Sequence, residues 1–378
     1  MAWEALGNKL LGEIKEENLS LILRDARKKV LSTKNEAQSS IGIQPIDEIL
    51  RALRSSHPVL EITSSGSADG KSSLLYYVAA IGILPQVLNG LRLGGKNGAV
   101  IYLDTDCRFS AERLRDICLH IIHETLHATE NNNLPLPGND DQSRLHALVE
   151  DCLQHVHVFR PKSSVSLLST IESLESYLTN TASHFSSQRH VHAVLLDSAS
   201  AFYWQDRREA ELMTVPGMLS HDASAGNSNS TGPRPRPVMQ LAKNTVRALL
   251  GFQQVFSCPI MYTVFGYHGS VGNIQPGQPS NSTTSYRPFL PPPWQSFPTL
   301  RFGVRCDPVR QFVPHLSLDE VKSEALSRQS IVNRGRYSGW IDPLVKEKWP
   351  SFTVDAINGL EGKGSFSFSA TKQGVSFR

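Results

Sequence analysis

Short apolar runs alternate with longer helical patterns through the middle of this 378-residue chain. The apolar runs occupy 58–63, 99–103, 155–159, 192–196 and 260–264. The helical patterns lie near 71–84, 109–128, 163–179 and 238–254. Each run is continuous instead of alternating with polar residues, which is typical of a strand buried on both faces. Such strands, separated by helices, predict an α/β fold with a mainly parallel central sheet flanked by helices.

The expected domain organisation has three parts. Residues 1–45 form an N-terminal helical segment with a linker, residues 46–310 form the core, and residues 311–378 form a C-terminal extension. Alternating Ser and Phe residues at 365–369, followed by 374–377, predict a terminal β hairpin at the end of this extension.

Long loops are expected to interrupt the core. The segments at about 205–237 and 266–293 are rich in Gly, Ser, Asn and Pro, and a shorter polar insert covers 131–141. These compositions cannot bury enough apolar surface to form packed elements, so we expect loops.

Composition and charge exclude several classes of protein. The chain is 40% apolar and 19% charged, which is typical of a soluble globular protein. Its net charge of +3 leaves nucleic-acid contacts to local patches. The five cysteines are scattered, which argues for reduced thiols and against a disulfide framework or a zinc knuckle. The N-terminus resembles no signal peptide, and no apolar run approaches the roughly 20 residues that span a bilayer.

The segment 65–72, Ser-Gly-Ser-Ala-Asp-Gly-Lys-Ser, has the layout of a phosphate-binding loop between a strand and a helix. In such loops backbone N–H groups converge on phosphate oxygens, glycine allows close approach, and the helix start adds positive charge. Lys71 is expected to reach the terminal phosphates and Ser72 to hold a magnesium ion. The candidate nucleotide-binding residues are Gly66, Ser67, Asp69, Gly70, Lys71, Ser72 and Ser73.

This loop departs from the pattern in two places. Ser65 stands where glycine is usual, and Asp69 brings a carboxylate that opposes phosphate unless it points away. A plain glycine–serine turn before a helix is the alternative interpretation of the segment.

Two strand ends carry carboxylates. Asp197 follows the run 192–196, where a P-loop protein needs an aspartate that holds magnesium through water. Asp106 follows the run 99–103, where an acid can orient or deprotonate the attacking water. The alternatives are a capping role for Asp197, and helix caps before 109–128 for Asp104 and Asp106.

Two longer motifs resemble the eukaryotic paralogues of the strand-exchange recombinase, within the RecA superfamily. The first is Asp104-Thr105-Asp106 with Phe109 and Glu112-Arg113-Leu114. The second and more specific is 195–204, Leu-Leu-Asp-Ser-Ala-Ser-Ala-Phe-Tyr-Trp. The resemblance extends from about residue 59 to the C-terminus and is interrupted by the expected loops.

The resemblance implies a RecA-like P-loop core that binds ATP and Mg²⁺, a nuclear location, and work in DNA repair by homologous recombination. It implies a hetero-complex with other recombinase paralogues, binding of single-stranded or branched DNA, and assistance to the recombinase filament. By position, Gly70, Lys71 and Ser72 bind phosphate and magnesium, Asp197 supports the metal, and Arg113 lies against the adenine.

Arginines in the two expected loops are the candidate DNA contacts. They are Arg207, Arg208, Arg234, Arg236 and Arg287. The alternative is solvated loop charge that aids solubility.

The sequence also departs from active recombinases. Asp106 stands in place of a glutamate and is one methylene shorter, and Phe265 stands where a glutamine senses the nucleotide. An error near 1 Å in the placement of the attacking water costs about 10²-fold. We therefore expect weak ATPase activity at most. The Phe-x-x-Ala segment that links subunits is absent ahead of the core, because the first phenylalanine is Phe109.

His123, Glu124 and His127 match the H-E-x-x-H pattern of zinc peptidases. They lie off the apolar stripe of the helix 109–128, as expected of an ordinary polar face, and no third ligand follows at the usual spacing.

Three functions compete. The leading one is an ATP-binding, DNA-binding recombination mediator. The second is a pseudo-ATPase scaffold with a vestigial nucleotide site. The third, an independent P-loop enzyme such as a kinase, lacks any sign of a phosphoacceptor pocket.

Overall fold

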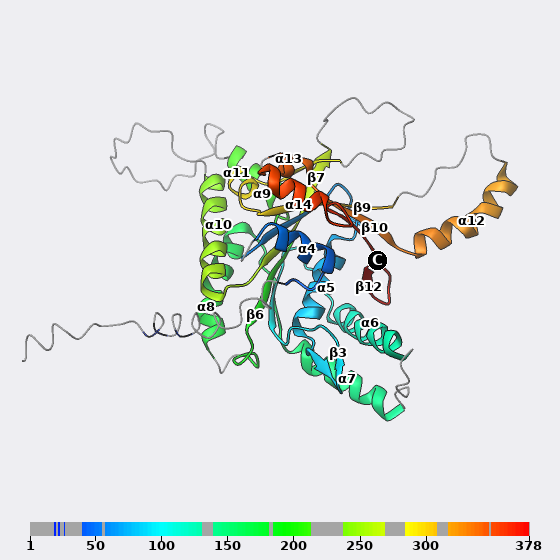
Figure 1. Cartoon of the computed structure of the whole chain (residues 1–378). Coiled ribbons are helices and arrows are strands. Elements are labelled where there is room, and N and C mark those ends of the chain that lie inside the picture. Colours follow the sequence, from blue (N-terminus) through cyan, green and yellow to red (C-terminus); the bar gives the residue numbers. More distant parts are fainter. Residues whose placement is uncertain are drawn as a thin grey trace, which may run out of the picture.

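The computed structural model is built around one large sheet with helices on both faces (Figure 1). It describes residues 40–54, 57–130, 139–180, 184–212, 237–268, 284–307, 317–347 and 349–377, together with Leu19, Ile22 and Ala26. The expected N-terminal helical segment lies almost wholly outside these residues and stays a prediction.

The sheet has ten strands in the order β12-β11-β10-β9-β1-β7-β6-β4-β5, with β8 paired to β7. The strands of its parallel part are β1 (Val59–Ser64), β4 (Ala99–Asp104), β5 (Val156–Phe159), β6 (Val191–Asp197), β7 (Ile260–His268) and β9 (Leu300–Cys306). The antiparallel strands are β8 (Tyr286–Pro288), β10 (Arg336–Ile341), β11 (Ser365–Ala370) and β12 (Val375–Phe377). The predicted mainly parallel sheet and the terminal hairpin are confirmed. A separate ribbon pairs β2 (Val87–Leu88) with β3 (Leu91–Arg92).

Helices cover both faces of the parallel strands. They are α4 (Gln44–Ala52), α5 (Lys71–Ile83), α6 (Ala111–Glu130), α7 (Asn139–Leu153), α8 (Ser164–Thr179), α9 (Tyr203–Leu212) and α10 (Pro237–Phe256). The C-terminal part adds α11 (Pro292–Gln295), α12 (Leu318–Asn333), α13 (Pro343–Lys346) and α14 (Ser351–Asn358). None of the helices in the described ranges is long and apolar enough to cross a membrane.

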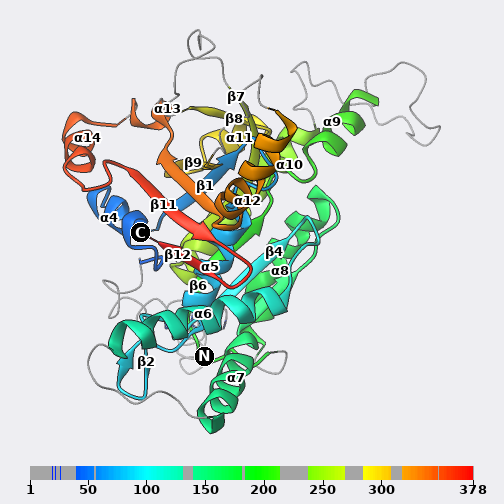
Figure 2. The same ribbon diagram turned by 90° about the vertical axis from the view of Figure 1, so that its right-hand side faces the viewer.

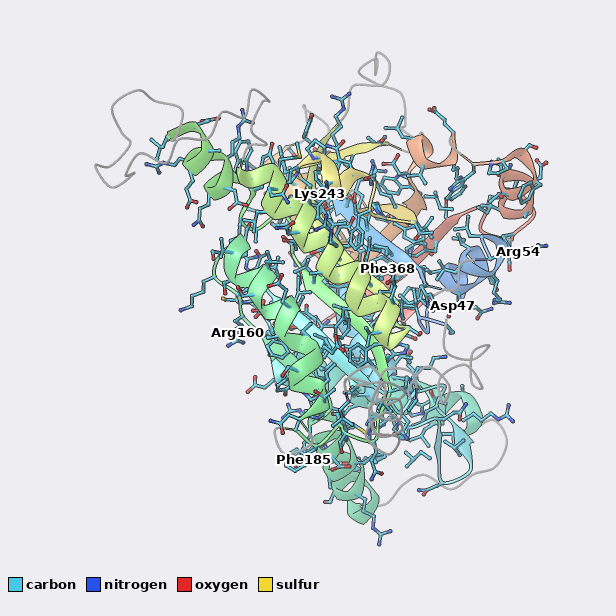
Figure 3. All side chains as sticks on the ribbon, turned by 90° about the vertical axis from the view of Figure 1, so that its left-hand side faces the viewer. Asp47, Arg54, Arg160, Phe185, Lys243 and Phe368 are labelled. Atoms are coloured by element: carbon cyan, nitrogen blue, oxygen red, sulfur yellow. The ribbon has the colours of Figure 1, made fainter. Side chains whose placement is uncertain are left out.

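Strand β4 shows why the apolar runs are continuous. Val100 and Tyr102 pack into the core beneath α5 and α6, whereas Ile101 and Leu103 pack into the core beneath α8 and α10. Successive side chains of a strand point to opposite faces, so a strand covered on both sides must be apolar at every position. Figure 3 views the face covered by α8 and α10.

The terminal hairpin joins the first of these cores. Phe366, Phe368 and Val375 belong to the same apolar cluster as the buried residues of α5. Figure 2 shows β11 and β12 beside α5. The antiparallel strands therefore extend the sheet next to the start of α5.

Some elements differ from the expectations. α9 occupies the beginning of the expected loop at 205–237, because Gln205–Glu209 and Arg207–Glu211 pair at helical spacing. α7 was not expected, although Leu145, Val149 and Cys152 are buried at helical spacing. Strands β9 and β10 and helix α12 were also missed. α12 begins with a capping box formed by Ser317 and Glu320.

Candidate nucleotide-binding site

The candidate site lies at the carboxyl ends of the central parallel strands. Ser64 at the end of β1 is in register with Phe265 of β7, and Asp104 at the end of β4 is in register with Asp197 of β6. Ligands of open α/β sheets bind at this edge, because the loops after the strands converge there.

The loop after β1 leads directly into α5. Gly70 has φ of 84°, a left-handed conformation that glycine adopts without strain, and α5 begins at Lys71. Lys71 is buried, at 5% exposure. Its Nζ donates to the Ser64 hydroxyl at 2.5 Å and to the Gly66 carbonyl at 2.8 Å. The ammonium group also lies 4.0 Å from the centre of the Phe265 ring.

The charge on Lys71 is held mostly by neutral groups. Burial lowers the pKa of Lys71 to about 8, against the opposing attraction of Asp69, Asp197 and Asp106. The structure therefore brings the lysine and these three predicted site residues into one electrostatic cluster. These aspartates do not offset the burial of the ammonium group, so an anion bound next to Lys71 would stabilise its charge.

Asp69 folds back onto its own loop. Its Oδ2 accepts the Gly66 N–H at 2.7 Å, and its Oδ1 accepts the Cys306 N–H from the end of β9 at 3.3 Å. The carboxylate thus takes a backbone donor that a phosphate oxygen needs. The sequence predicted that the Asp69 carboxylate opposes phosphate binding unless it points away. In the structure it competes with phosphate by accepting the Gly66 N–H.

Asp197 ends β6 as a buried carboxylate. It accepts the Thr263 hydroxyl on Oδ1 at 2.5 Å and the Tyr102 hydroxyl on Oδ2 at 3.1 Å. Burial raises the pKa of Tyr102 well above its usual value, so the phenol stays a donor at neutral pH. These two hydroxyls fix the carboxylate at the sheet edge.

The two acids after β4 differ. The carboxylate of Asp104 accepts the N–H groups of Arg108 and Phe109 and pairs with Arg160 at 3.1 Å. It therefore holds the segment that leads into α6, in agreement with the capping alternative. Asp106 lies against Asp197 instead, and its N–H donates to the Asp197 carbonyl at 3.3 Å. Burial, and then Asp197, raise the pKa of Asp106.

The polar groups at this edge fit a magnesium nucleotide, provided that the Asp69 carboxylate leaves the Gly66 N–H. Ser67 and Ser72 are exposed and Ser73 is half-buried, so their hydroxyls are accessible to a ligand. The buried ammonium group of Lys71 suits a phosphate, and hydroxyl and carboxylate oxygens suit Mg²⁺. The individual roles of these residues stay predictions.

Arg113 lies on α6 and contacts the terminal hairpin. Its Nη1 donates to the Lys372 carbonyl in the turn between β11 and β12 at 2.5 Å. The stacked rings of Tyr337 and Phe368 lie against Gly70 of the loop 65–72. A Cβ at Gly70 would be 2.9 Å from the Tyr337 ring, so a larger residue would not fit without a shift. Sequence reasoning missed Tyr337 and Cys306, because neither belongs to a local motif.

The predicted DNA-binding arginines divide into two groups. Arg207 and Arg208 lie on α9 and Arg287 lies on β8, and both elements are in the upper part of Figure 2. Arg207 pairs with Glu211 at 3.0 Å. Arg234 and Arg236 lie outside the described residues.

The H-E-x-x-H residues lie on the outer side of α6. Glu124 is exposed and pairs with His120 at 3.2 Å, while Leu114, Ile117 and Cys118 are buried as the helical stripe predicted. Among the residues that the structure describes, no group of three or more His, Cys, Asp or Glu side chains is placed to hold a metal ion.

The fold and the edge of the sheet together define an α/β protein with a RecA-like core. No family model matches the chain. Over 199 residues the chain is 27% identical to the DNA repair protein XRCC2 homolog of Arabidopsis thaliana. The match covers 50% of this chain and 52% of that protein, so the chain spans about half the length of the curated relative that it matches. The similarity supports an XRCC2-like paralogue of the RecA superfamily, in agreement with the motif-based resemblance.

Proposed function

We propose that this chain is an ATP-binding paralogue of the strand-exchange recombinase that serves DNA repair by homologous recombination in the nucleus. The convergence of Lys71, Asp197 and Asp106 at one sheet edge carries the proposal. The similarity to an XRCC2 homolog supplies the repair context. Its partners would be other recombinase paralogues and single-stranded or branched DNA.

In this proposal the chain's own groups position the nucleotide. Lys71 would give up its bonds to Ser64 and Gly66 and turn to the terminal phosphates, and Ser72 and Asp197 would hold the metal. Bound ATP with Mg²⁺ would supply phosphate groups that these residues bind and a terminal phosphate bond that is hydrolysed slowly. Asp106 is too short to place the attacking water well, and Phe265 offers no polar group to a phosphate.

A titration with fluorescent ATP and Mg²⁺ tests the nucleotide site. Wild type should bind, and Lys71→Ala should weaken binding at least tenfold, because the phosphates lose their cation. Lys243→Ala, which removes an exposed lysine of α10 (Figure 3), is the matched control and should bind as wild type does. Turnover of several molecules per second by the isolated chain would contradict the assignment of Asp106 and Phe265.

One observation favours the second candidate, a pseudo-ATPase scaffold. The Asp69 carboxylate occupies the Gly66 N–H, and Lys71 is satisfied within the protein. A loop of this kind is stable without a nucleotide. Wild type that binds no ATP, yet co-purifies and cross-links with other paralogues, would establish the scaffold in place of the mediator.

A further inference from the structure

Four aromatic rings form a patch at the sheet edge beside the nucleotide site: Tyr203, Trp204, Tyr267 and Phe289. Trp204 lies 5.0 Å from Tyr203 and 5.4 Å from Phe289, and Phe289 lies 5.3 Å from Tyr267, between ring centres. The rings come from the start of α9, the end of β7 and the segment after β8, in the upper part of Figure 2.

This aromatic patch is not part of the folded core. Trp204 is 59% exposed and Tyr267 is 45% exposed. The two apolar clusters of the described residues include none of the four rings. Contiguous exposed aromatic surface costs hydration free energy, and it marks interaction sites more often than chance.

Three arginines lie on the elements that carry the rings. The Arg207 guanidinium lies 5.7 Å from the centre of the Trp204 ring. Arg287 is directly opposite Tyr267 in the β7–β8 ladder, so both side chains lie on one face of that ribbon. Arg208 is exposed on the same helix as Trp204.

Two of the three acids of α9 leave these cations accessible to a phosphate, and the third, Glu209, accepts the Gln205 amide N–H at 3.1 Å. Asp206 accepts the Ser164 hydroxyl at 2.6 Å, which directs it toward α8 and away from the rings. Glu211 pairs with Arg207 in an exposed bridge, and such a bridge contributes little stability, so a phosphate can replace it.

Exposed aromatic rings interleaved with arginines suit an unpaired nucleic-acid strand. Each base presents a flat face that stacks on a ring, while the arginines follow the phosphates. Duplex bases already stack on their neighbours and do not expose these faces. We propose that the aromatic patch is a stacking platform for the bases of single-stranded DNA, with Trp204 and Tyr267 as its contact rings. This inference rests on the proposed function and goes beyond it by assigning base contacts.

The patch is joined to the nucleotide site. The Phe289 N–H donates to the Phe265 carbonyl at 2.9 Å, and the Phe265 ring packs against Lys71.

Binding of two labelled oligonucleotides tests the platform. One is a single-stranded polythymidine, and the other has the same length and backbone but abasic sites in place of the bases. Wild type should prefer the polythymidine by on the order of tenfold for each stacked base. Trp204→Ala and Tyr267→Ala should each reduce that preference, and Trp204→Phe should retain most of it.

Phe185→Ala is the matched control, because Phe185 is 78% exposed at the end of the molecule far from α9 (Figure 3). It should leave both affinities unchanged. Binding of polythymidine should also quench the fluorescence of Trp204, and Trp204→Phe should lose that quenching.

The outcomes separate the inference from the proposed function. Equal affinity of wild type for both oligonucleotides overturns the stacking platform and leaves a DNA-binding paralogue intact. Absence of DNA binding at any salt concentration overturns the DNA-binding part of the proposed function. If Trp204→Ala keeps the base preference but loses a paralogue in co-purification, the patch is a protein contact and the inference is wrong.

Discussion

Two buried cations beside strand β1 differ in their partners: one is paired with a carboxylate and the other is not. Arg301 meets Glu61 in a direct ion pair, with Nε–Oε1 at 2.5 Å and Nη2–Oε2 at 3.2 Å. Lys71, at the start of α5, reaches back to the end of the same strand. It has no carboxylate within ion-pair distance among the described residues, and its ammonium group donates to neutral oxygens. The first charge is committed to the fold, whereas the second is available to an anion from outside.

The hydrogen bonds of Glu61 add to the difference between Arg301 and Lys71. Its carboxylate also accepts the hydroxyls of Tyr262 at 2.9 Å and Thr63 at 2.8 Å. Burial alone would lower the pKa of Arg301, but attraction to Glu61 and its hydrogen bonds outweigh burial and raise it. Burial instead dominates at Lys71 and lowers its pKa to about 8. The comparison teaches that the absence of a fixed counter-ion, more than burial, distinguishes a cation that is available to a ligand from a structural one.

The largest expected effect is on the structural pair. Glu61→Gln leaves Arg301 buried without its counter-ion, and should lower the free energy of unfolding by about 3–5 kcal/mol. Urea denaturation measures this change. Glu324→Gln breaks the partly exposed Arg328–Glu324 pair within α12 and is the control, with an expected loss below about 1 kcal/mol. Equal losses in Glu61→Gln and Glu324→Gln would show that the buried pair is no more important to the fold than a surface pair. The contrast between a structural Arg301 and an available Lys71 would then fail.

A smaller effect of opposite sign is expected at Lys71. Because its folded-state pKa of about 8 lies below the ordinary value of 10.5, the unfolded chain binds more protons between these pH values. Stability should therefore rise as pH increases from about 8 to about 10.5, by up to about 3 kcal/mol from this group.

The variant Lys71→Met isolates that contribution from the other titrating groups. It should remove this rise and be at least as stable as wild type at pH 7, since no charge remains to be buried. Unfolding curves of the two proteins across that range give the difference. A rise that persists unchanged in Lys71→Met would show that Lys71 keeps an ordinary pKa.

The smallest expected effect sharpens the role of Asp69. Asp69→Asn removes a negative charge from the loop and weakens the acceptor that holds the Gly66 N–H, so ATP affinity should increase on the order of tenfold, about 1.4 kcal/mol. Titration with fluorescent ATP and Mg²⁺ measures it. Asp116→Asn removes an exposed charge from α6 and should leave the affinity unchanged. Lower affinity in Asp69→Asn would mean that Asp69 assists the nucleotide instead of competing with it.

Local motifs made part of the site predictable. The strand, the loop 65–72 and α5 are consecutive in the chain, so their order alone indicated a phosphate-binding loop. Asp197 was recognisable because it ends a continuous apolar run. The placement of the Asp69 carboxylate was only partly predictable. One partner, Gly66, is three residues away, but the other, Cys306, is 237 residues away and belongs to a strand that the sequence did not reveal.

The sequence by itself determined most of the parallel part of the sheet and the edge where the candidate site lies. Strands covered on both faces must be apolar throughout, and consecutive strand–helix units place their loops on one side. The tertiary structure alone decided which charges are paired. Glu61 and Arg301 lie 240 residues apart and meet only because β9 aligns beside β1, while nothing comparable aligns a carboxylate with Lys71 in the described chain. Electrostatic energy depends on the distance between charges and on their burial, and neither quantity can be calculated from the order of residues alone.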